Sequence, residues 1–146
     1  MRTVFADTGY WIALLNPRDA LHTKAITLST SLRPLRLITS EMVLIELLND
    51  FAARGTYLRR AAVALSNQLY KDPNTTVVPQ TSIQFEDVLS FYAQREDKGW
   101  SYTDCSSFCI MQQAGITEAL AYDKHFEQAG KRALLRDDNI SPTNRT

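Results

Sequence analysis

Short apolar runs alternate along this chain with segments in which apolar residues recur at helical spacing. A strand buried on both faces of a parallel sheet reads as a continuous apolar run, whereas a surface helix places apolar residues three or four positions apart. The continuous runs predict four strands, at Thr3–Ala6, Leu35–Thr39, Thr75–Val78 and Glu118–Tyr122. A fifth run, Ala133–Leu135, predicts an edge strand.

Helical spacing fills the segments between these runs. Pro34, Gly55 and Gly115 end three of the segments, because proline and glycine interrupt helices. The predicted helices cover Tyr10–Leu14, Asp19–Ser31, Met42–Phe51 with Ser40 as cap, Tyr57–Lys71, a helix that carries Phe85–Tyr92 after a capping box at Thr81-x-x-Gln84, Ser101–Ala114 and a short stretch from Asp123 to Gly130. Strands that alternate with helices favour an α/β fold with a mainly parallel sheet of four to five strands.

The length of 146 residues fits a single domain. We expect this domain to occupy residues 1–136 and the polar tail, residues 137–146, to be disordered. The composition, 45% apolar and 22% charged, is that of a soluble globular protein. No segment has the length of a membrane span, and the N-terminus lacks the pattern of a signal peptide.

The net charge is zero, because Lys plus Arg and Asp plus Glu number 16 each. Binding to nucleic acid would therefore require a local basic patch or a metal ion. The two cysteines, Cys105 and Cys109, lie four positions apart on one predicted helix and are expected to pack as small apolar residues. With His22 and His125 as the only histidines, a zinc site is disfavoured. The absence of a disulfide framework fits a reducing, cytoplasmic location.

Acidic residues stand where the predicted strands end. Asp7 follows the first strand and Asp123 follows the fourth. Glu46 is the single charge in an apolar stretch of the helix after the second strand, and Asp104 opens the helix that leads into the fourth. In open α/β sheets ligands bind at the carboxyl ends of the strands, so we expect these four acids to lie near one another.

Each acid also has a purely structural interpretation. Asp7 and Asp123 stand where they would cap the helices after them, and Glu46 could extend off the rim of its helix. Ser101-x-x-Asp104 has the form of a capping box, with Ser101 as N-cap. Helix capping does not require the four acids to lie near one another. Binding of Mg²⁺ or Mn²⁺ requires it, because one such hard cation takes several oxygen ligands at the same point.

Four carboxylates at close range raise one another's pKa, because their negative charges repel. A divalent cation relieves this repulsion and attracts phosphate. Water bound to such an ion has a lowered pKa and can attack a phosphodiester, and a second ion would stabilise the leaving oxygen. The acids therefore predict metal-dependent chemistry on a phosphodiester, with one ion or two left open.

Four segments carry a resemblance to a known family. They read V-F-A-D-T at 4–8, T-S-E at 39–41 followed by Glu46, W-S-Y-T-D-C at 100–105 and A-Y-D-K-H-F at 121–126. Over roughly residues 1–135 the chain resembles the PIN-domain family and, more narrowly, the VapC-type ribonuclease toxins of prokaryotic type II toxin–antitoxin pairs. The third segment is the most specific, since it combines six positions.

The resemblance implies a three-layer α/β/α sandwich and a Mg²⁺- or Mn²⁺-dependent endoribonuclease that cleaves RNA. The acids that it implies are Asp7 and Asp104 as metal ligands, with Glu46 and Asp123 acting through water or orienting the attacking water. Thr8 and Thr103 would hold the carboxylates in place. The resemblance also implies a homodimer and a cognate antitoxin protein that blocks the site.

Contacts to the substrate are less well defined by the sequence. Arg54, Arg59 and Arg60 cluster where one helix ends and the next begins, and they could contact RNA phosphates, an acidic antitoxin segment or only water. Asp97 stands where some relatives carry a further acid, and it also fits a solvated charged run. Tyr10 and Trp11 could stack a base, although packing in the core is favoured.

Two other functions stay open. A PIN-fold regulatory module that binds RNA or a partner without cleavage would share the fold, although the complete set of acids counts against it. A phosphohydrolase that uses Asp7 as a nucleophile usually needs a second aspartate two positions on, where this chain has Gly9.

Overall fold

The computed structural model describes residues 1–137 of the protein. The strands are β1 (Arg2–Ala6), β2 (Leu35–Ser40), β3 (Thr75–Val78), β4 (Glu118–Leu120) and β5 (Arg132–Ala133). The helices are α1 (Thr8–Leu15), α2 (His22–Ser31), α3 (Glu41–Phe51), α4 (Thr56–Lys71), α5 (Ser82–Ala93), α6 (Tyr102–Ala114) and α7 (Lys124–Gln128), with a final 3₁₀ turn at Leu134–Arg136. The tail beyond Asp137 lies outside the described residues.

The five strands form one parallel sheet in the order β3-β2-β1-β4-β5. The central strand β1 pairs on one side with β2, where Phe5 aligns with Ile38, and on the other with β4, where Ala6 aligns with Leu120. Because all strands run in one direction, their carboxyl ends meet at one edge of the sheet. The prediction of a mainly parallel sheet is confirmed.

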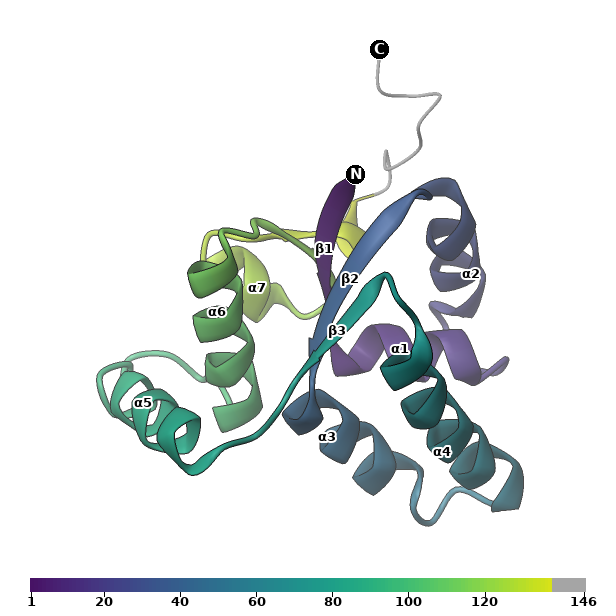
Figure 1. Ribbon diagram of the computed structural model, residues 1–146, viewed down its shortest axis with the longest axis horizontal. Helices are drawn as coiled ribbons and strands as arrows, with labels where there is room; N and C mark the ends of the chain where they lie inside the picture. The colour runs from purple at the N-terminus through teal and green to yellow at the C-terminus, as the bar shows by residue number, and fades with distance from the viewer. Residues whose placement is uncertain (138–146) are drawn as a thin grey trace.

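Helices cover both faces of this sheet (Figure 1). In that view α5, α6 and α7 lie to the left of the strands, and α1, α2 and α4 lie to the right. Helix α3 lies at the carboxyl ends of the strands, where it contacts both α1 and α6. The molecule is therefore a three-layer α/β/α sandwich, as the sequence predicts.

The core explains why the first strand lacks polar alternation. Val4, Phe5 and Ala6 are fully buried because helices cover β1 on both faces. Burying a side chain of the size of phenylalanine or leucine stabilises the fold by about 1.5–3 kcal/mol. Tyr10 and Trp11 also belong to the core, each with 2% of its surface exposed, so the stacking of a base on either ring is excluded.

The boundaries of three predicted elements are wrong. Helix α2 starts at His22 instead of Asp19, because the Asp19 carboxylate accepts a hydrogen bond from the Leu21 N–H (2.9 Å) and holds a turn there. Strand β4 ends at Leu120 instead of Tyr122. The expected fifth strand, Ala133–Leu135, is shifted to Arg132–Ala133, because the chain then turns and the Leu135 N–H bonds the Ala121 carbonyl (3.0 Å).

Ser40 and Gly115 mark the ends of two helices. Ser40 accepts a hydrogen bond from the Val43 N–H at the start of α3 (3.1 Å). Gly115 ends α6 in the left-handed conformation (φ 68°), which glycine adopts without steric cost. None of the helices within residues 1–137 combines the length and the apolar character that a membrane span requires.

Candidate functional site

Asp7 occupies the junction between β1 and α1. Its backbone N–H bonds the Leu120 carbonyl (3.1 Å), which extends the pairing of β1 with β4 by one residue. Although Asp7 is the N-cap residue of α1, its side chain makes no capping hydrogen bond to that helix. The capping interpretation of this side chain is therefore wrong, and the carboxylate is left to face the edge of the sheet.

Burial gives the Asp7 carboxyl an abnormal acidity. Its pKa rises to about 8, chiefly because burial removes water from the charged form. The Thr8 backbone N–H opposes this rise, while the negative charges of Asp104, Glu46 and Asp123 add to it. The structure thus places a costly carboxylate among three others, an arrangement that a bound cation would relieve.

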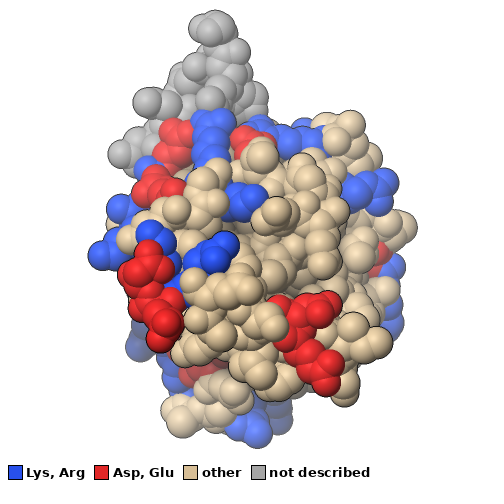
Figure 2. Space-filling view, turned by 90° about the vertical axis from the view of Figure 1, so that its left-hand side faces the viewer, with Lys and Arg blue, Asp and Glu red and all other residues tan. Residues whose placement is uncertain are grey.

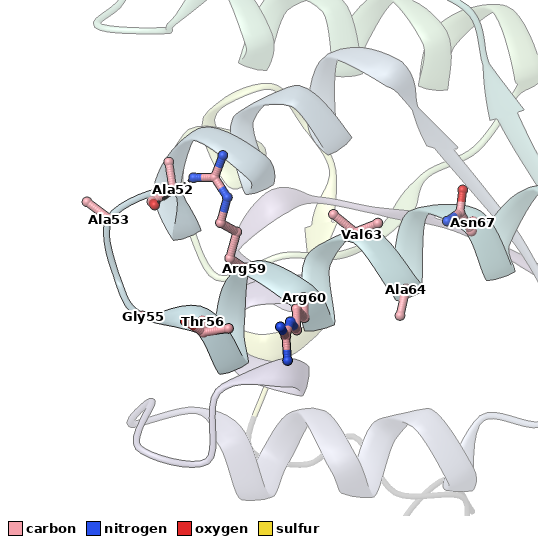
Figure 3. A pocket seen from close by; sticks show the side chains of 9 residues that line it. All are labelled: Ala52, Ala53, Gly55, Thr56, Arg59, Arg60, Val63, Ala64 and Asn67. Atoms are coloured by element: carbon pink, nitrogen blue, oxygen red, sulfur yellow. Dashed lines mark hydrogen bonds between the residues drawn. The ribbon is translucent and has the colours of Figure 1, made fainter.

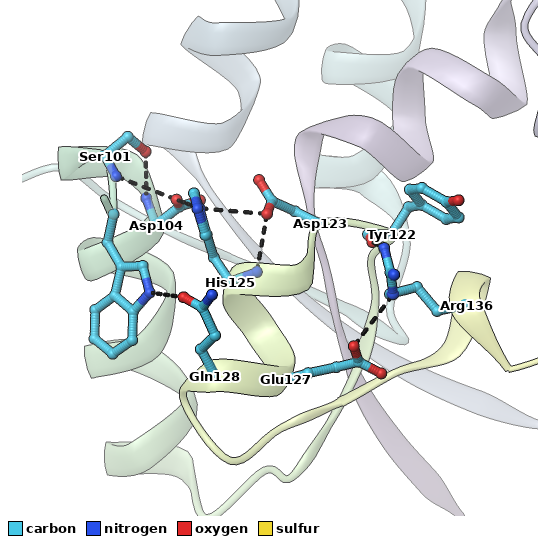
Figure 4. A network of polar contacts seen from close by, with 9 residues as sticks. Ser101, Asp104, Tyr122, Asp123, His125, Glu127, Gln128 and Arg136 are labelled. Atoms are coloured by element: carbon cyan, nitrogen blue, oxygen red, sulfur yellow. Dashed lines mark hydrogen bonds and ion pairs between the residues drawn. The ribbon is translucent and has the colours of Figure 1, made fainter. Parts of the chain in front are cut away.

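Asp104 is held by the capping box that the sequence predicts. The Ser101 hydroxyl accepts a hydrogen bond from the Asp104 N–H (3.0 Å), and the Asp104 Oδ2 accepts one from the Ser101 N–H (3.2 Å). His125 also bonds Oδ2 through its Nδ1 (2.9 Å). Figure 4 shows the contacts of the Ser101 N–H and the His125 ring with the Asp104 carboxylate. Capping and placement in the cleft therefore coexist in Asp104.

Asp123 caps α7 and at the same time faces Asp104. Its Oδ1 accepts a hydrogen bond from the His125 N–H (2.9 Å) and lies 3.3 Å from the His125 Nδ1 (Figure 4). One possible ligand atom from each of Asp104, Asp123 and His125 falls within 4.8 Å of the others. This spacing is compatible with three groups around one small cation.

Glu46 reaches the same place from α3. The apolar face of that helix, which includes Val43, Leu47 and Phe51, is buried in the core. Glu46 and Asp50 lie one helical turn apart on another face, and both line the cleft that contains Asp7. The interpretation of Glu46 as a bystander on the helix rim does not fit this placement.

These side chains enclose a cleft of about 370 Å³ at the carboxyl edge of the sheet. The residues that line it are Asp7, Thr8, Gly9, Ile12, Glu46, Asp50, Gly99, Ser101, Asp104, Tyr122, Asp123 and His125. All four predicted acids are among them. Strands β1 and β4 and helices α3, α6 and α7 supply these acids, so the cleft exists only in the folded chain.

The two predicted supporting threonines differ in position. Thr8 lines the cleft, and its buried Oγ1 has no hydrogen-bond partner within residues 1–137. A buried hydroxyl without a partner is costly, so a water or an ion shell at this point would satisfy it. Thr103 is also buried, but it does not line the cleft.

Asp50 and His125 were not predicted as site residues. Asp50 is ion-paired with Arg54 (2.7 Å), and its position four residues after Glu46 was the signal that could have revealed it. His125 follows Asp123 by two residues, a spacing that is uninformative until α7 is seen to turn it toward Asp104. Asp97, by contrast, is exposed, lies 3.6 Å from Lys98 and does not line the cleft.

The three predicted arginines lie beside the α3–α4 turn. Arg54 pairs with Asp50, which lines the cleft, whereas the Arg59 guanidinium donates a hydrogen bond to the Ala52 carbonyl (2.8 Å). Arg59 and Arg60 line a second hollow of about 780 Å³ (Figure 3). Among residues 1–137 no acid lines this larger hollow, so the chemistry expected of a cation belongs to the smaller cleft.

The cysteines and the C-terminal segment form no further site among residues 1–137. Cys105 is buried and Cys109 is half-buried, and both are free thiols. Burial raises the pKa of Cys105 to about 11, with the Asp104 charge as a lesser cause, so this thiol stays neutral. Asp137, the first residue of the expected tail, accepts a hydrogen bond from the Arg132 guanidinium.

The donors around the cleft fit a divalent cation. Carboxylate oxygens predominate, and hard cations such as Mg²⁺ and Mn²⁺ prefer oxygen. Asp7 has a raised pKa, and the Thr8 hydroxyl has no partner within residues 1–137, so these residues alone do not satisfy the polar groups of the cleft. Asp104, Asp123 and His125 offer possible ligand atoms within 4.8 Å of one another, and Asp7 and Glu46 line the same cleft.

The chain has a parallel five-stranded sheet between two helical layers, and its acids gather at the carboxyl edge of that sheet. The chain matches the PIN domain family over residues 4–132, a range that contains the entire cleft, and it belongs to that family. The resemblance noted in the sequence is thereby confirmed.

Particular relatives refine this assignment. The 23S rRNA-specific endonuclease VapC20 of Mycobacterium tuberculosis is 32% identical over 130 residues, which cover 87% of this chain and 94% of that protein. The crystal structure of VapC20, described as a Sarcin-Ricin loop cleaving toxin, has a TM-score of 0.77 at 31% identity and covers 88% of this chain and 95% of its own.

A more distant structure shares the fold alone. FitAcB from Neisseria gonorrhoeae has a TM-score of 0.54 at 19% identity, over 89% of this chain and 94% of its own. The sandwich architecture therefore persists at low identity, while the closer similarity to VapC20 extends to nearly the whole of both chains.

Proposed function

We propose that this protein is a divalent-metal-dependent endoribonuclease and the toxin of a toxin–antitoxin pair. The observation that carries the proposal is the convergence of Asp7, Glu46, Asp104 and Asp123 on one cleft of a PIN domain. The similarity to a 23S rRNA-specific endonuclease over 130 residues supports the same reaction class.

In this proposal the four acids have two different roles. Asp7 and Asp104 bind the ion directly, while Glu46 and Asp123 bind through water or orient the water that attacks the phosphodiester. Thr8 turns its unpartnered hydroxyl toward this shell, and Thr103 supports the helical turn that carries Asp104.

Mg²⁺ or Mn²⁺ would supply the charge that the chain lacks. When bound, the ion lowers the pKa of water and neutralises the phosphate. The protein's own contribution is geometric: its acids fix where the attacking water sits relative to the phosphorus, so that attack and departure of the leaving oxygen are in line. Because the chain has no net positive charge, its attraction to RNA depends on this cleft and on local basic patches.

The relatives suggest a substrate and a location. VapC20 is specific for 23S rRNA, and we propose the RNA of the large ribosomal subunit as the first substrate to test for this chain. Such a reaction takes place in the cytoplasm, which is also where free thiols such as Cys105 and Cys109 persist.

Two protein partners belong to the proposal. An acidic segment of an antitoxin would fit beside Arg59 and Arg60 in the hollow at the α3–α4 turn. A second copy of the chain would cover the exposed apolar side chains of α5, namely Ile83, Phe85, Leu89 and Tyr92. The side of the molecule that carries α5, α6 and α7 shows a broad area free of charged residues (Figure 2), which is suited to such a contact.

The test is cleavage of RNA by the purified protein with Mg²⁺ or Mn²⁺ and with a chelator. We expect cleavage only with the ion, and a loss of more than about 100-fold in Asp7→Asn and Asp104→Asn. Asp97→Asn is the matched control, because this acid is exposed and outside the cleft. If both cleft variants cleaved RNA at the wild-type rate, the assignment as a metal-dependent ribonuclease would be wrong. Ion binding without cleavage would favour the RNA- or partner-binding module.

A further inference from the structure

His125 brings a different chemistry to the acidic cleft. Among the residues that line the cleft within 1–137, it alone carries a side-chain nitrogen. The ring is partly buried, with 22% of its side-chain surface exposed. Its Nδ1 lies 2.9 Å from the Asp104 Oδ2 and 3.3 Å from the Asp123 Oδ1, so one ring atom bridges acids carried by α6 and by the start of α7.

The local packing fixes this position of the ring. Phe126, the next residue, is fully buried and meets the Phe108 ring of α6 edge-on, with 4.9 Å between the ring centroids. Gln128, near the end of α7, accepts a hydrogen bond from the Trp100 indole N–H (3.0 Å; Figure 4). Residues that follow His125 thus hold α7 against α6 and against Trp100, which precedes α6, and the imidazole cannot move away without breaking these contacts.

The hydrogen bonds to Asp104 are unequally shared between its two oxygens. Oδ2 accepts from the Ser101 N–H (3.2 Å) and faces the His125 Nδ1 (2.9 Å). A carboxylate held at one oxygen by two donors from different directions has lost its freedom to rotate, and the other oxygen, Oδ1, is presented in a fixed direction. Nδ1 donates in this contact, because a carboxylate oxygen only accepts.

We propose that His125 is a positioning residue, which locks the Asp104 carboxylate through Nδ1 so that Oδ1 is aimed at the cation. The inference rests on the proposed function, since it concerns the ion which that function requires. His125 does not bind the ion in this arrangement. The contact with His125 holds the Asp104 carboxylate in place before the ion binds, so no free energy is spent on ordering this ligand. Loss of such a supporting contact lowers metal affinity by about 10- to 100-fold.

Two amide substitutions test whether the hydrogen-bond donor at Nδ1 matters, or only the size of the imidazole ring. In His125→Asn the amide nitrogen sits near the position of Nδ1, whereas in His125→Gln it sits near that of Nε2. We expect calorimetric Mn²⁺ titration to show affinity within about threefold of wild type for His125→Asn, and a loss of about 10- to 100-fold for His125→Gln and His125→Phe.

A control and a spectroscopic measurement complete the experiment. His22→Asn removes the other imidazole, whose Nδ1 contacts the Ala13 carbonyl (2.7 Å) outside the cleft, and should leave Mn²⁺ affinity unchanged. Circular dichroism of each variant, recorded without metal, restricts the comparison to folded protein. Pulsed EPR of bound Mn²⁺ should show no directly bonded nitrogen in the wild type.

The possible failures are distinguishable. A nitrogen signal on Mn²⁺ would make His125 a ligand and overturn the positioning role, as would equal affinities in all His125 variants. Either result leaves the nuclease proposal standing. Failure of the wild type to bind Mn²⁺ would overturn both, whereas normal Mn²⁺ binding without RNA cleavage would overturn the nuclease alone.

Discussion

The backbone N–H of Asp7 donates a hydrogen bond to the carbonyl of Leu120 (3.1 Å), which joins the end of the first strand to the end of the fourth. The two residues are more than a hundred positions apart in the sequence. Asp123 follows Leu120 by three residues, so this contact brings two of the cleft acids to the same edge of the sheet. A one-residue change in this register would move Asp7 out of the cleft.

The raised pKa of Asp7 predicts that the stability of the folded protein depends on pH. Because its folded pKa (about 8) exceeds its ordinary value, 3.8, the fold favours the neutral acid, and stability is lost as pH rises from about 4 to about 8. Asp7→Asn mimics the neutral form. Without metal it should match the wild type near pH 4 and exceed its free energy of unfolding by about 1–2 kcal/mol at pH 8.

Urea denaturation across that pH range, in the presence of a chelator, measures this difference. Asp97→Asn, which removes an exposed acid outside the cleft, is the control for loss of a charge. If the difference between Asp7→Asn and the wild type did not grow with pH, Asp7 would not be an unfavourably buried acid.

Ion binding should stabilise the folded protein. A ligand that binds only the native state adds about 2.7 kcal/mol at roughly 100 times its dissociation constant. For a chain of this length we expect Mn²⁺ to raise the melting temperature by roughly 5–11 °C in the wild type. Asp104→Asn should lose most of that increase. An equal increase in this variant would place the ion elsewhere on the protein.

The capping box should serve both stability and metal binding. Ser101→Ala removes the hydroxyl that accepts from the Asp104 N–H and should cost about 1 kcal/mol of folding free energy. Because the same turn orients Asp104, we also expect weaker Mn²⁺ affinity. Thr81→Ala removes a cap of the same kind at α5, where Thr81 accepts from the Gln84 N–H (3.1 Å), outside the cleft.

Denaturation and calorimetry on these two variants separate the effects. Both should lose similar stability, while only Ser101→Ala should lose metal affinity. If Thr81→Ala reduced Mn²⁺ binding equally, the loss would reflect general destabilisation of the helical layer, and the capping box would have no special part in the site.

The arginines at the α3–α4 turn should contribute to the binding of RNA if they meet its phosphates. Removing one phosphate contact lowers the salt dependence of binding by about one counterion. We expect Arg60→Ala to reduce the slope of log affinity against log salt by about 0.7 for single-stranded RNA. The experiment uses Asp104→Asn protein, so that the RNA stays intact.

Arg36→Ala is the control for this measurement. Arg36 is exposed on β2, near the end of the sheet opposite the cleft, and its removal should leave the slope unchanged. An unchanged slope in Arg60→Ala would assign this arginine to the antitoxin surface or to solvent.

The sequence by itself determined the order of the elements and the identity of the acids. Continuous apolar runs such as Val4–Ala6 require burial on both faces, which already implies a parallel sheet between helices. Ser101 and Asp104 form their capping box within four residues, so local spacing was sufficient to predict it. The boundaries of α2 and β5 could not be read in this way, because turns and long-range hydrogen bonds set them.

Only the tertiary structure decided how these acids meet. Asp7 has the sequence position of a helix cap, yet its side chain makes no capping hydrogen bond to α1, while Asp123 both caps α7 and lines the cleft. His125 gives no sequence signal of its role, because its contact with Asp104 spans 21 positions and depends on how α7 packs against α6. Periodicity reports which face of an element is buried, whereas the distance between groups on different elements is set by strand register and helix packing.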